Sequence, residues 1–170
     1  MITEKIESAK KEVEEIYKYL SDAVRETTRE YTKTLDDIVA ELDKDINLFT
    51  NSELWNFQVR LGIEAYRLGN IKEQGLLKES CAETLLKEGV ARAFTTATGT
   101  QEIKKQQSIL DTVDKQALSM LYSSVASLLK TKCDEAHRLV NILQSIQISR
   151  AAEAKQFASP RSEQDRLTLE

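Results

Sequence analysis

The sequence predicts an all-α fold, an elongated antiparallel helical bundle with two long helices of about 2–49 and 101–157. All five glycines lie between Gly62 and Gly99, and the only proline is Pro160. Glycine and proline cost a helix interior about 1 and about 3 kcal/mol relative to alanine, so their absence from both long stretches favours uninterrupted helix. Apolar residues also recur every three or four positions along these stretches, as on one face of an α-helix.

The first helix changes its apolar spacing near Leu20. Before that point the steps alternate between three and four, at Ile6, Ala9, Val13, Ile16 and Leu20. This heptad spacing is typical of a left-handed coiled-coil seam against another helix. From Leu20 to Phe49 the steps follow an eleven-residue repeat, which favours straight or slightly right-handed packing. The whole helix would be about 70 Å long at 1.5 Å per residue.

A middle arm is expected to follow the first helix. Thr50 and Glu53 have the spacing of a reciprocal helix cap, so we expect the chain to reverse there and begin a new helix. Gly69 and Asn70 combine a helix-ending glycine with a residue that caps the next helix, which predicts a break in this arm. The two pieces span about 52–68 and 71–97. A kink at the break gives three arms of nearly equal length, whereas a reversal gives four helices, and both remain open.

The last helix is expected to begin after Thr100, which fits an N-cap, and to stop before Pro160. In the three-arm arrangement its final turns overhang the bundle, and overhanging apolar helix favours a protein partner or self-association. The candidate partner contacts are Ile146, Ile148 and Phe157. We expect one helical domain of 1–157 and a flexible tail of 158–170, because the tail offers little to bury.

Composition limits the classes of protein to which the chain can belong. It has 170 residues, the size of one ordinary domain, with 41% apolar and 31% charged residues. That is too hydrophobic for a disordered chain and too charged for a membrane span, and the first residues lack the basic and apolar segments of a signal peptide. We therefore expect a soluble, cytoplasmic protein. The net charge of −4 gives no general reason to bind nucleic acid or anionic lipid.

A local basic stripe on the last helix is the best candidate surface for nucleic acid. Its residues are Lys130, Lys132, Arg138, Arg150 and Lys155. Asp134 and Glu135 interrupt the stripe, and no aromatic side chains interleave with it to stack on bases. A solvated helix face is the alternative interpretation.

The residue patterns that suggest chemistry are incomplete. Residues 134–137 spell Asp-Glu-Ala-His, letters that hold magnesium in helicases, but the sequence lacks the glycine-rich phosphate loop which that motif requires. Cys133 and His137 are four residues apart and could face one metal ion. His137 is the only histidine, so sites with two or three histidines cannot form within one chain, and only a site shared across a dimer axis stays open.

Cys81 and Cys133 are the only cysteines, and we expect both to be free thiols. In a hairpin that turns at Gly99 they are offset by roughly 20 Å along the helix axis. A disulfide allows no more than about 7 Å between the two Cα atoms.

These observations together predict a non-enzymatic helical interaction, adaptor or assembly protein that acts through its helix surfaces and forms an oligomer. No catalytic residue, cofactor, metal or small-molecule substrate is expected, because a nucleophile would have to recruit the single histidine from the middle of a helix, without a strand-to-helix elbow or oxyanion donors. The alternative function is a nucleic-acid-associated accessory protein that uses the basic stripe. Membrane-surface binding is not expected, since the polar face of the first helix is acidic.

Overall fold

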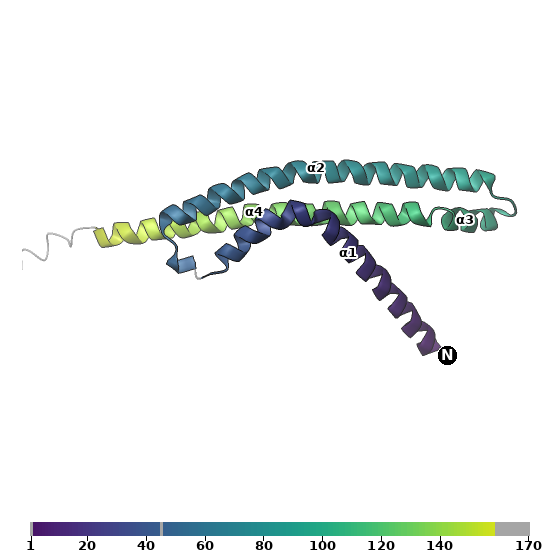
Figure 1. Ribbon diagram of the computed structural model, residues 1–170, viewed down its shortest axis with the longest axis horizontal. Coiled ribbons are helices and arrows are strands. Elements are labelled where there is room, and N and C mark those ends of the chain that lie inside the picture. Colours follow the sequence, from purple (N-terminus) through teal and green to yellow (C-terminus); the bar gives the residue numbers. More distant parts are fainter. Residues whose placement is uncertain (1, 45, 159–170) are drawn as a thin grey trace, which may run out of the picture.

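The computed structural model describes residues 2–44 and 46–158, which form an elongated bundle (Figure 1). The elements are α1 (Ile2–Leu42), the short 3-10 helix η1 (Ile46–Leu48), α2 (Asn51–Thr96), α3 (Gln101–Leu110) and α4 (Val113–Ala158). No strand occurs in these ranges, so the predicted all-α class is confirmed. The tail predicted for 158–170 falls, beyond Ala158, outside the described residues.

The capping pair predicted at the start of the middle arm is confirmed. The Thr50 hydroxyl accepts a hydrogen bond from the Glu53 amide at 3.2 Å, and the Thr50 amide donates to the Glu53 carboxylate at 2.7 Å. Each side chain thus satisfies a backbone amide that the helix itself leaves without a partner. The ring of Phe49, just before the cap, packs edge-on against Phe57 at 5.2 Å. The chain reverses here and α2 begins.

The break predicted at Gly69 and Asn70 is wrong, because α2 is one continuous helix. Gly99 is the only described residue with a positive φ, so Gly69 does not end a helix. Leu68 before it is fully buried and Ile71 after it packs against the core. Burial on both sides of a weak local stop signal holds the helix together, as tertiary contacts routinely override propensity. The chain therefore does not reverse at Gly69, and the four-helix arrangement that a reversal would give does not occur.

The last helix, predicted to be unbroken from 101 to 157, is interrupted at Asp111 and Thr112. The Thr112 amide bonds to the Ile109 carbonyl at 3.2 Å, one residue nearer than in an α-helix. The Thr112 hydroxyl donates to the Ser108 carbonyl at 2.8 Å, and both side chains are buried. These local bonds satisfy the polar groups at the interruption. No glycine or proline marks it, so the helix-breaker argument missed it.

α2 and α4 form an antiparallel hairpin in a constant register. The side-chain amide of Gln147 donates to the Asn51 carbonyl at 2.9 Å, and the Cys133 thiol lies 3.5 Å from the Ala65 carbonyl. Nearer the turn, a Cβ placed on Gly75 would lie 3.6 Å from the Ala126 Cα. Buried small residues repeat every seven positions on α2, at Gly75, Ala82 and Gly89. They let the two helices approach closely.

The hairpin register keeps the cysteines apart, as predicted, and both are free. Cys133 lies opposite Ala65, which is sixteen residues before Cys81 on α2. That separation is about 24 Å along the helix axis, far beyond disulfide reach.

α1 does not form a full-length arm of the bundle, and the predicted helix of 2–49 ends at Leu42. Its C-terminal half packs on the hairpin, where Leu35 and Ile38 are buried. Its N-terminal half leaves the hairpin after crossing α4 (Figure 1), so Val13 and Ile16 are exposed. Because only half of α1 packs, the predicted bundle of three equal arms is wrong.

Two threonines lie where the packed half of α1 begins. The Thr27 hydroxyl donates to the Ala23 carbonyl at 2.7 Å, and the Thr28 hydroxyl donates to the Val24 carbonyl at 2.8 Å. Such bonds from threonine to the carbonyl four residues earlier often bend a helix. They give a physical account of why α1 turns away from α4 rather than following it.

The core sits at the end of the hairpin that α1 covers. Its fully buried members come from all three long helices: Leu35, Ile38, Leu54, Leu61, Leu68, Leu129 and Leu143. The other end of the hairpin has no third helix over it (Figure 1). Within the described ranges, no helix has a stretch long and apolar enough to pass through a lipid bilayer.

Replacing Gly69 with alanine should raise the free energy of unfolding by about 1 kcal/mol, because alanine is the better helix former. Its Cβ would meet no atom within 4 Å. The same replacement at Gly99, where φ is 113°, should lower the free energy by about 1–3 kcal/mol. Urea unfolding followed by circular dichroism measures both. Destabilisation by Gly69→Ala would mean that a helix does end there.

The start of α2 should respond to pH. The pKa of Glu53 lies below its usual value, first because the Thr50 amide donates to its carboxylate and then because the Thr50 hydroxyl does. The stabilisation is complete above the unfolded pKa of about 4.3 and is lost as the pH falls through the lower folded value. Glu53→Gln keeps an acceptor but cannot ionise.

The stability difference between the native chain and Glu53→Gln should therefore shrink from about pH 6 to about pH 3. Urea unfolding at a series of pH values measures this difference directly. A difference that stays constant across the range would show that Glu53 does not stabilise the cap through its charge.

Candidate interaction surfaces

The outer face of α2 carries a row of large exposed apolar side chains at helical spacing. The row consists of Trp55, Val59, Ile63 and Tyr66, and we call it the Trp55 row. Trp55 is 62% exposed and Tyr66 is 74% exposed. The opposite face of the same helix is anchored in the core through Leu61 and Leu68. The row is therefore presented on a fixed element rather than on a loop.

Gly62 lies within the Trp55 row and has no packing role in this chain. A Cβ placed on it would meet no atom within 4 Å. Glycine in a helix interior costs about 1 kcal/mol relative to alanine, and nothing inside the molecule offsets that cost. A small residue between large apolar ones favours close approach by the backbone of another helix.

The second exposed surface is the N-terminal half of α1, residues 2–23, which we call the arm. The heptad positions Val13 and Ile16 are 64% and 59% exposed, and Tyr17 and Tyr19 also lie open to solvent. The change of spacing near Leu20 thus falls close to the point where α1 leaves the hairpin. The heptad seam belongs to the unpacked half of the helix.

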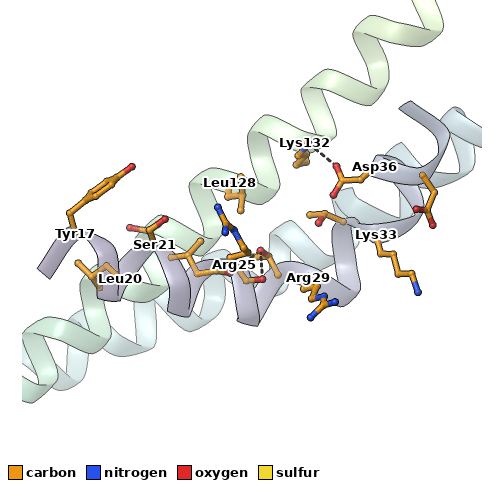
Figure 2. A pocket seen from close by; sticks show the side chains of 14 residues that line it. Tyr17, Leu20, Ser21, Arg25, Arg29, Lys33, Asp36, Leu128 and Lys132 are labelled. Carbon is orange, nitrogen blue, oxygen red and sulfur yellow. Dashed lines mark hydrogen bonds and ion pairs between the residues drawn. The ribbon is translucent and has the colours of Figure 1, made fainter. Parts of the chain in front are cut away.

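A groove runs between α1 and α4 where the two helices cross (Figure 2). Leu20, Val24 and Leu128 contribute its apolar lining. Arg25 points toward α4, whereas Arg29 and Lys33 point away from it (Figure 2). Both acidic and basic side chains line the groove, so it does not select for one sign of charge.

A more apolar groove lies in the angle between the arm and the start of α4. Its lining includes Ile16, Tyr19, Leu20 and Ala23 from α1, and Val113, Ala117, Leu118, Met120 and Leu121 from α4. Sequence reasoning did not predict this groove. It exists because the arm diverges from α4, which periodicity along one chain segment cannot reveal.

Two arginines and one lysine attach α1 to the hairpin. Arg60 donates to both carboxylate oxygens of Glu41, at 2.7 and 3.1 Å, and the pKa of Glu41 is lowered chiefly by this bond. Arg67 donates to the Tyr31 carbonyl at 2.6 Å and to the nearly buried Glu64 at 2.7 Å. Glu64 lies three residues before Arg67 on α2, whereas the contacts of Arg60 with Glu41 and of Arg67 with Tyr31 join different helices, and no local pattern predicts them.

Lys132, from the predicted basic stripe, is engaged within the molecule. Its ammonium group lies 2.9 Å from Asp36 on α1 (Figure 2) and 3.1 Å from Glu135 on α4. Burial acts to lower the pKa of Lys132, but the hydrogen bonds that its ammonium group donates to Asp36 and Glu135 outweigh burial, and the pKa is raised. The side chain is paired and only partly accessible, which removes it from a free basic surface.

Arg150 is also engaged, because its guanidinium donates to the Phe49 carbonyl at 2.7 Å and to the Ile46 carbonyl at 3.2 Å. It holds the connection between α1 and α2 against α4. The other stripe residues, Lys130, Arg138 and Lys155, are exposed. The structure therefore does not bring the five predicted residues together as one free surface.

The residues predicted to contact a partner are also only partly available: one packs in the molecule and another is exposed. Ile146 is partly buried against the core, so it supports the fold. Ile148 is 62% exposed and remains available. The side chain of Phe157 lies outside the described part of the structure.

The candidate metal pair has its two atoms close together without further ligands. The Cys133 Sγ and His137 Nδ1 atoms are 3.8 Å apart, and Cys133 is buried against α2. Across the described residues, no group of three or more His, Cys, Asp or Glu side chains could hold a metal ion.

No family model, curated protein or solved structure matches this chain.

Replacing Arg150 with alanine should lower the free energy of unfolding by about 1.5–3 kcal/mol, because two carbonyls lose a charged donor. Arg138→Ala is the matched control, since Arg138 is an exposed member of the same predicted stripe, and it should change stability by less than about 0.5 kcal/mol. Urea unfolding of both variants measures the contrast. Equal effects would contradict the structural role of Arg150.

Proposed function

We propose that this chain is a non-enzymatic helical interaction protein, an adaptor or assembly factor that binds other proteins through its exposed helix faces. The observation that carries the proposal is the Trp55 row on the outer face of α2. Tryptophan and tyrosine are enriched among the few residues that dominate the energy of protein interfaces. Two of them occur in one row of four exposed apolar side chains.

The rigidity of α2 supports this function. Leu54, Leu61 and Leu68 anchor the inner face of α2 in the core, so the outer face is ordered before any partner arrives. A preorganised surface loses less conformational entropy on binding, and a larger part of the contact energy appears as affinity. Gly62 offers a place where the backbone of a partner helix can come close.

The alternative function, association with nucleic acid, gains no support from a specific contact. Lys132 and Arg150 are held in bonds within the molecule, which leaves three exposed members of the stripe. That function stays a prediction of the sequence, as does the cytoplasmic location, where we propose that the protein acts.

The proposal is tested by capture of partners from native lysate on the immobilised full chain. The double variant Trp55→Ser, Tyr66→Ser should lose a captured partner at least tenfold, because it removes the two aromatic members of the row. Both side chains are exposed, so the variant should fold. Leu48→Ser is the matched control, since Leu48 is an exposed apolar residue outside the row.

Quantitative mass spectrometry of the captured protein measures the effect. Equal capture by the native chain, the double variant and the control would contradict the role of the Trp55 row. A stoichiometric metal or nucleotide found by native mass spectrometry of the purified chain would contradict the non-enzymatic assignment.

A further inference from the structure

The hairpin has two halves, and α1 covers only one. Three contacts define the face on which α1 lies: Asp36 with Lys132 on α4, and Tyr31 and Glu41 with Arg67 and Arg60 on α2. Toward the turn at Gly99, α2 continues beside the start of α4 and then beside α3, and no further helix lies over them near the turn (Figure 1).

The face used by α1 extends along α2 into the uncovered half. Eighteen residues make five full helical turns, so Arg60 and Arg67 share their face with Lys78 and Leu85. Leu85 is 52% exposed. The face of α2 that binds α1 through Arg60 and Arg67 therefore carries the exposed Leu85 in the uncovered half.

The same step applies to α4. Five turns before Lys132 lies Asp114, and Leu118 and Leu121 follow it on one face of the helix. Leu118 is 39% exposed. We call the uncovered surface formed by Lys78, Leu85, Asp114, Leu118 and Leu121 the distal channel.

The arm matches the uncovered part of α2 in length. The arm, residues 2–23, contains 22 residues and spans about 33 Å. The uncovered part of α2, from Gly75 to Thr96, also contains 22 residues and has the same length. Each chain therefore has a helix whose N-terminal part is unpacked, and an open surface of similar length that this helix borders only at its Ile16–Ala23 end.

The arm also matches the distal channel in charge and polarity. Five turns before Asp36 on α1 lies Lys18, and five turns before its partner Lys132 lies Asp114, so the ion pair recurs with its signs exchanged. Tyr31 on α1 contacts Arg67 on α2. Five turns before Tyr31 lies Val13, and five turns after Arg67 lies Leu85, so these two residues would face each other in the same register. Both of these apolar side chains are more than half exposed.

The arm borders the distal channel of its own chain only near Ile16 and Leu20, which line one groove with Leu118 and Leu121. Toward its N-terminus the arm points away from the hairpin (Figure 1). α1 turns away at the crossing with α4, where the hydroxyls of Thr27 and Thr28 bond to carbonyls four residues earlier. Exchange of such a helix between two identical chains, known as domain swapping, is a low-cost route to a dimer.

We propose that the protein forms a symmetric dimer in which the arm of each copy lies in the distal channel of the other. Exchange of two arms covers both channels and leaves no unpaired site, so the assembly closes at two copies. The Trp55 row takes no part in this contact. The dimer and the partner-binding function can therefore fail independently.

Light scattering of the purified full chain gives the first test. The expected mass is twice the 19.3 kDa of one chain, and dilution should give a reversible dimer–monomer transition. A monomer at all concentrations up to about 100 µM, which corresponds to a weak affinity, would overturn the proposal.

Charge reversal tests the register. Lys18→Glu and Asp114→Lys should each weaken the dimer about tenfold, since every copy contributes the pair once and like charges then face each other. The double variant Lys18→Glu, Asp114→Lys should restore the native affinity. All of these positions are exposed, so folding should not change.

Lys11→Glu is the matched control for the charge of the arm. Lys11 lies five turns before Arg29, which points away from α4 (Figure 2). The dimer affinity of the Lys11→Glu variant should stay within about twofold of the native value, well below the loss expected when a contacting ion pair is reversed. Equal weakening by Lys11→Glu and Lys18→Glu, or failure of the double variant to recover, would contradict the proposed register.

Cross-linking distinguishes exchange from closure within one chain. A Cys81→Ser background removes the exposed native thiol. Chains carrying Val13→Cys are mixed with chains carrying Leu85→Cys and oxidised mildly, and the expected product is a covalent pair of chains. An intrachain disulfide in a monomeric Val13→Cys, Leu85→Cys double variant, with no mixed pair, would show that the arm closes on its own hairpin and would overturn the proposal.

Discussion

The close antiparallel packing of α2 against α4 is the constraint on which the rest of the molecule depends. Small residues at Gly75, Ala82 and Gly89 let the helices approach near the turn, and leucines such as Leu61 and Leu129 fill the space between them at the other end. Buried apolar surface contributes about 25 cal/mol per Å², so these contacts supply most of the stabilisation that an elongated molecule can have. α1, η1 and α3 take their positions from this hairpin.

The attachment of α1 shows how polar contacts add to that framework. Arg60 and Arg67 reach from α2, and Lys132 reaches from α4, to groups on one face of α1. Exposed ion pairs contribute little stability by themselves, with a median of about 0–1 kcal/mol. Their value lies in setting the register of α1 over a core that Leu35 and Ile38 help to fill. Beyond these contacts, α1 is free to leave the hairpin.

Large parts of the helix surfaces in this elongated molecule are exposed to solvent. The Trp55 row lies on the outside of α2, and the arm and distal channel lie where the third helix is missing. Large exposed apolar side chains in rows mark surfaces that other proteins cover. The proposed function and the proposed dimer use different faces of one rigid hairpin, so a partner could bind to the Trp55 row while two copies exchange arms.

Several features were determined by the sequence alone. The absence of glycine and proline from the terminal stretches predicted the all-α class, and the Thr50 and Glu53 pair predicted the start of α2, because helix propensity and capping depend on neighbouring residues. The hairpin register that separates Cys81 from Cys133 followed from the position of the turn. These properties depend on neighbouring residues, or follow from the number of residues between a side chain and the turn.

Only the tertiary structure decided where helices continue and which charges are free. Burial of Leu68 and Ile71 carries α2 through Gly69, whereas bonds of Thr112 interrupt the last helix without any breaker residue. Lys132 and Arg150 look like surface charges in sequence, yet Lys132 reaches Asp36 and Arg150 reaches the Phe49 carbonyl, each about a hundred residues away. The departure of α1 from the hairpin likewise depends on packing between distant segments, and the periodicity of one segment holds no information about what lies opposite it.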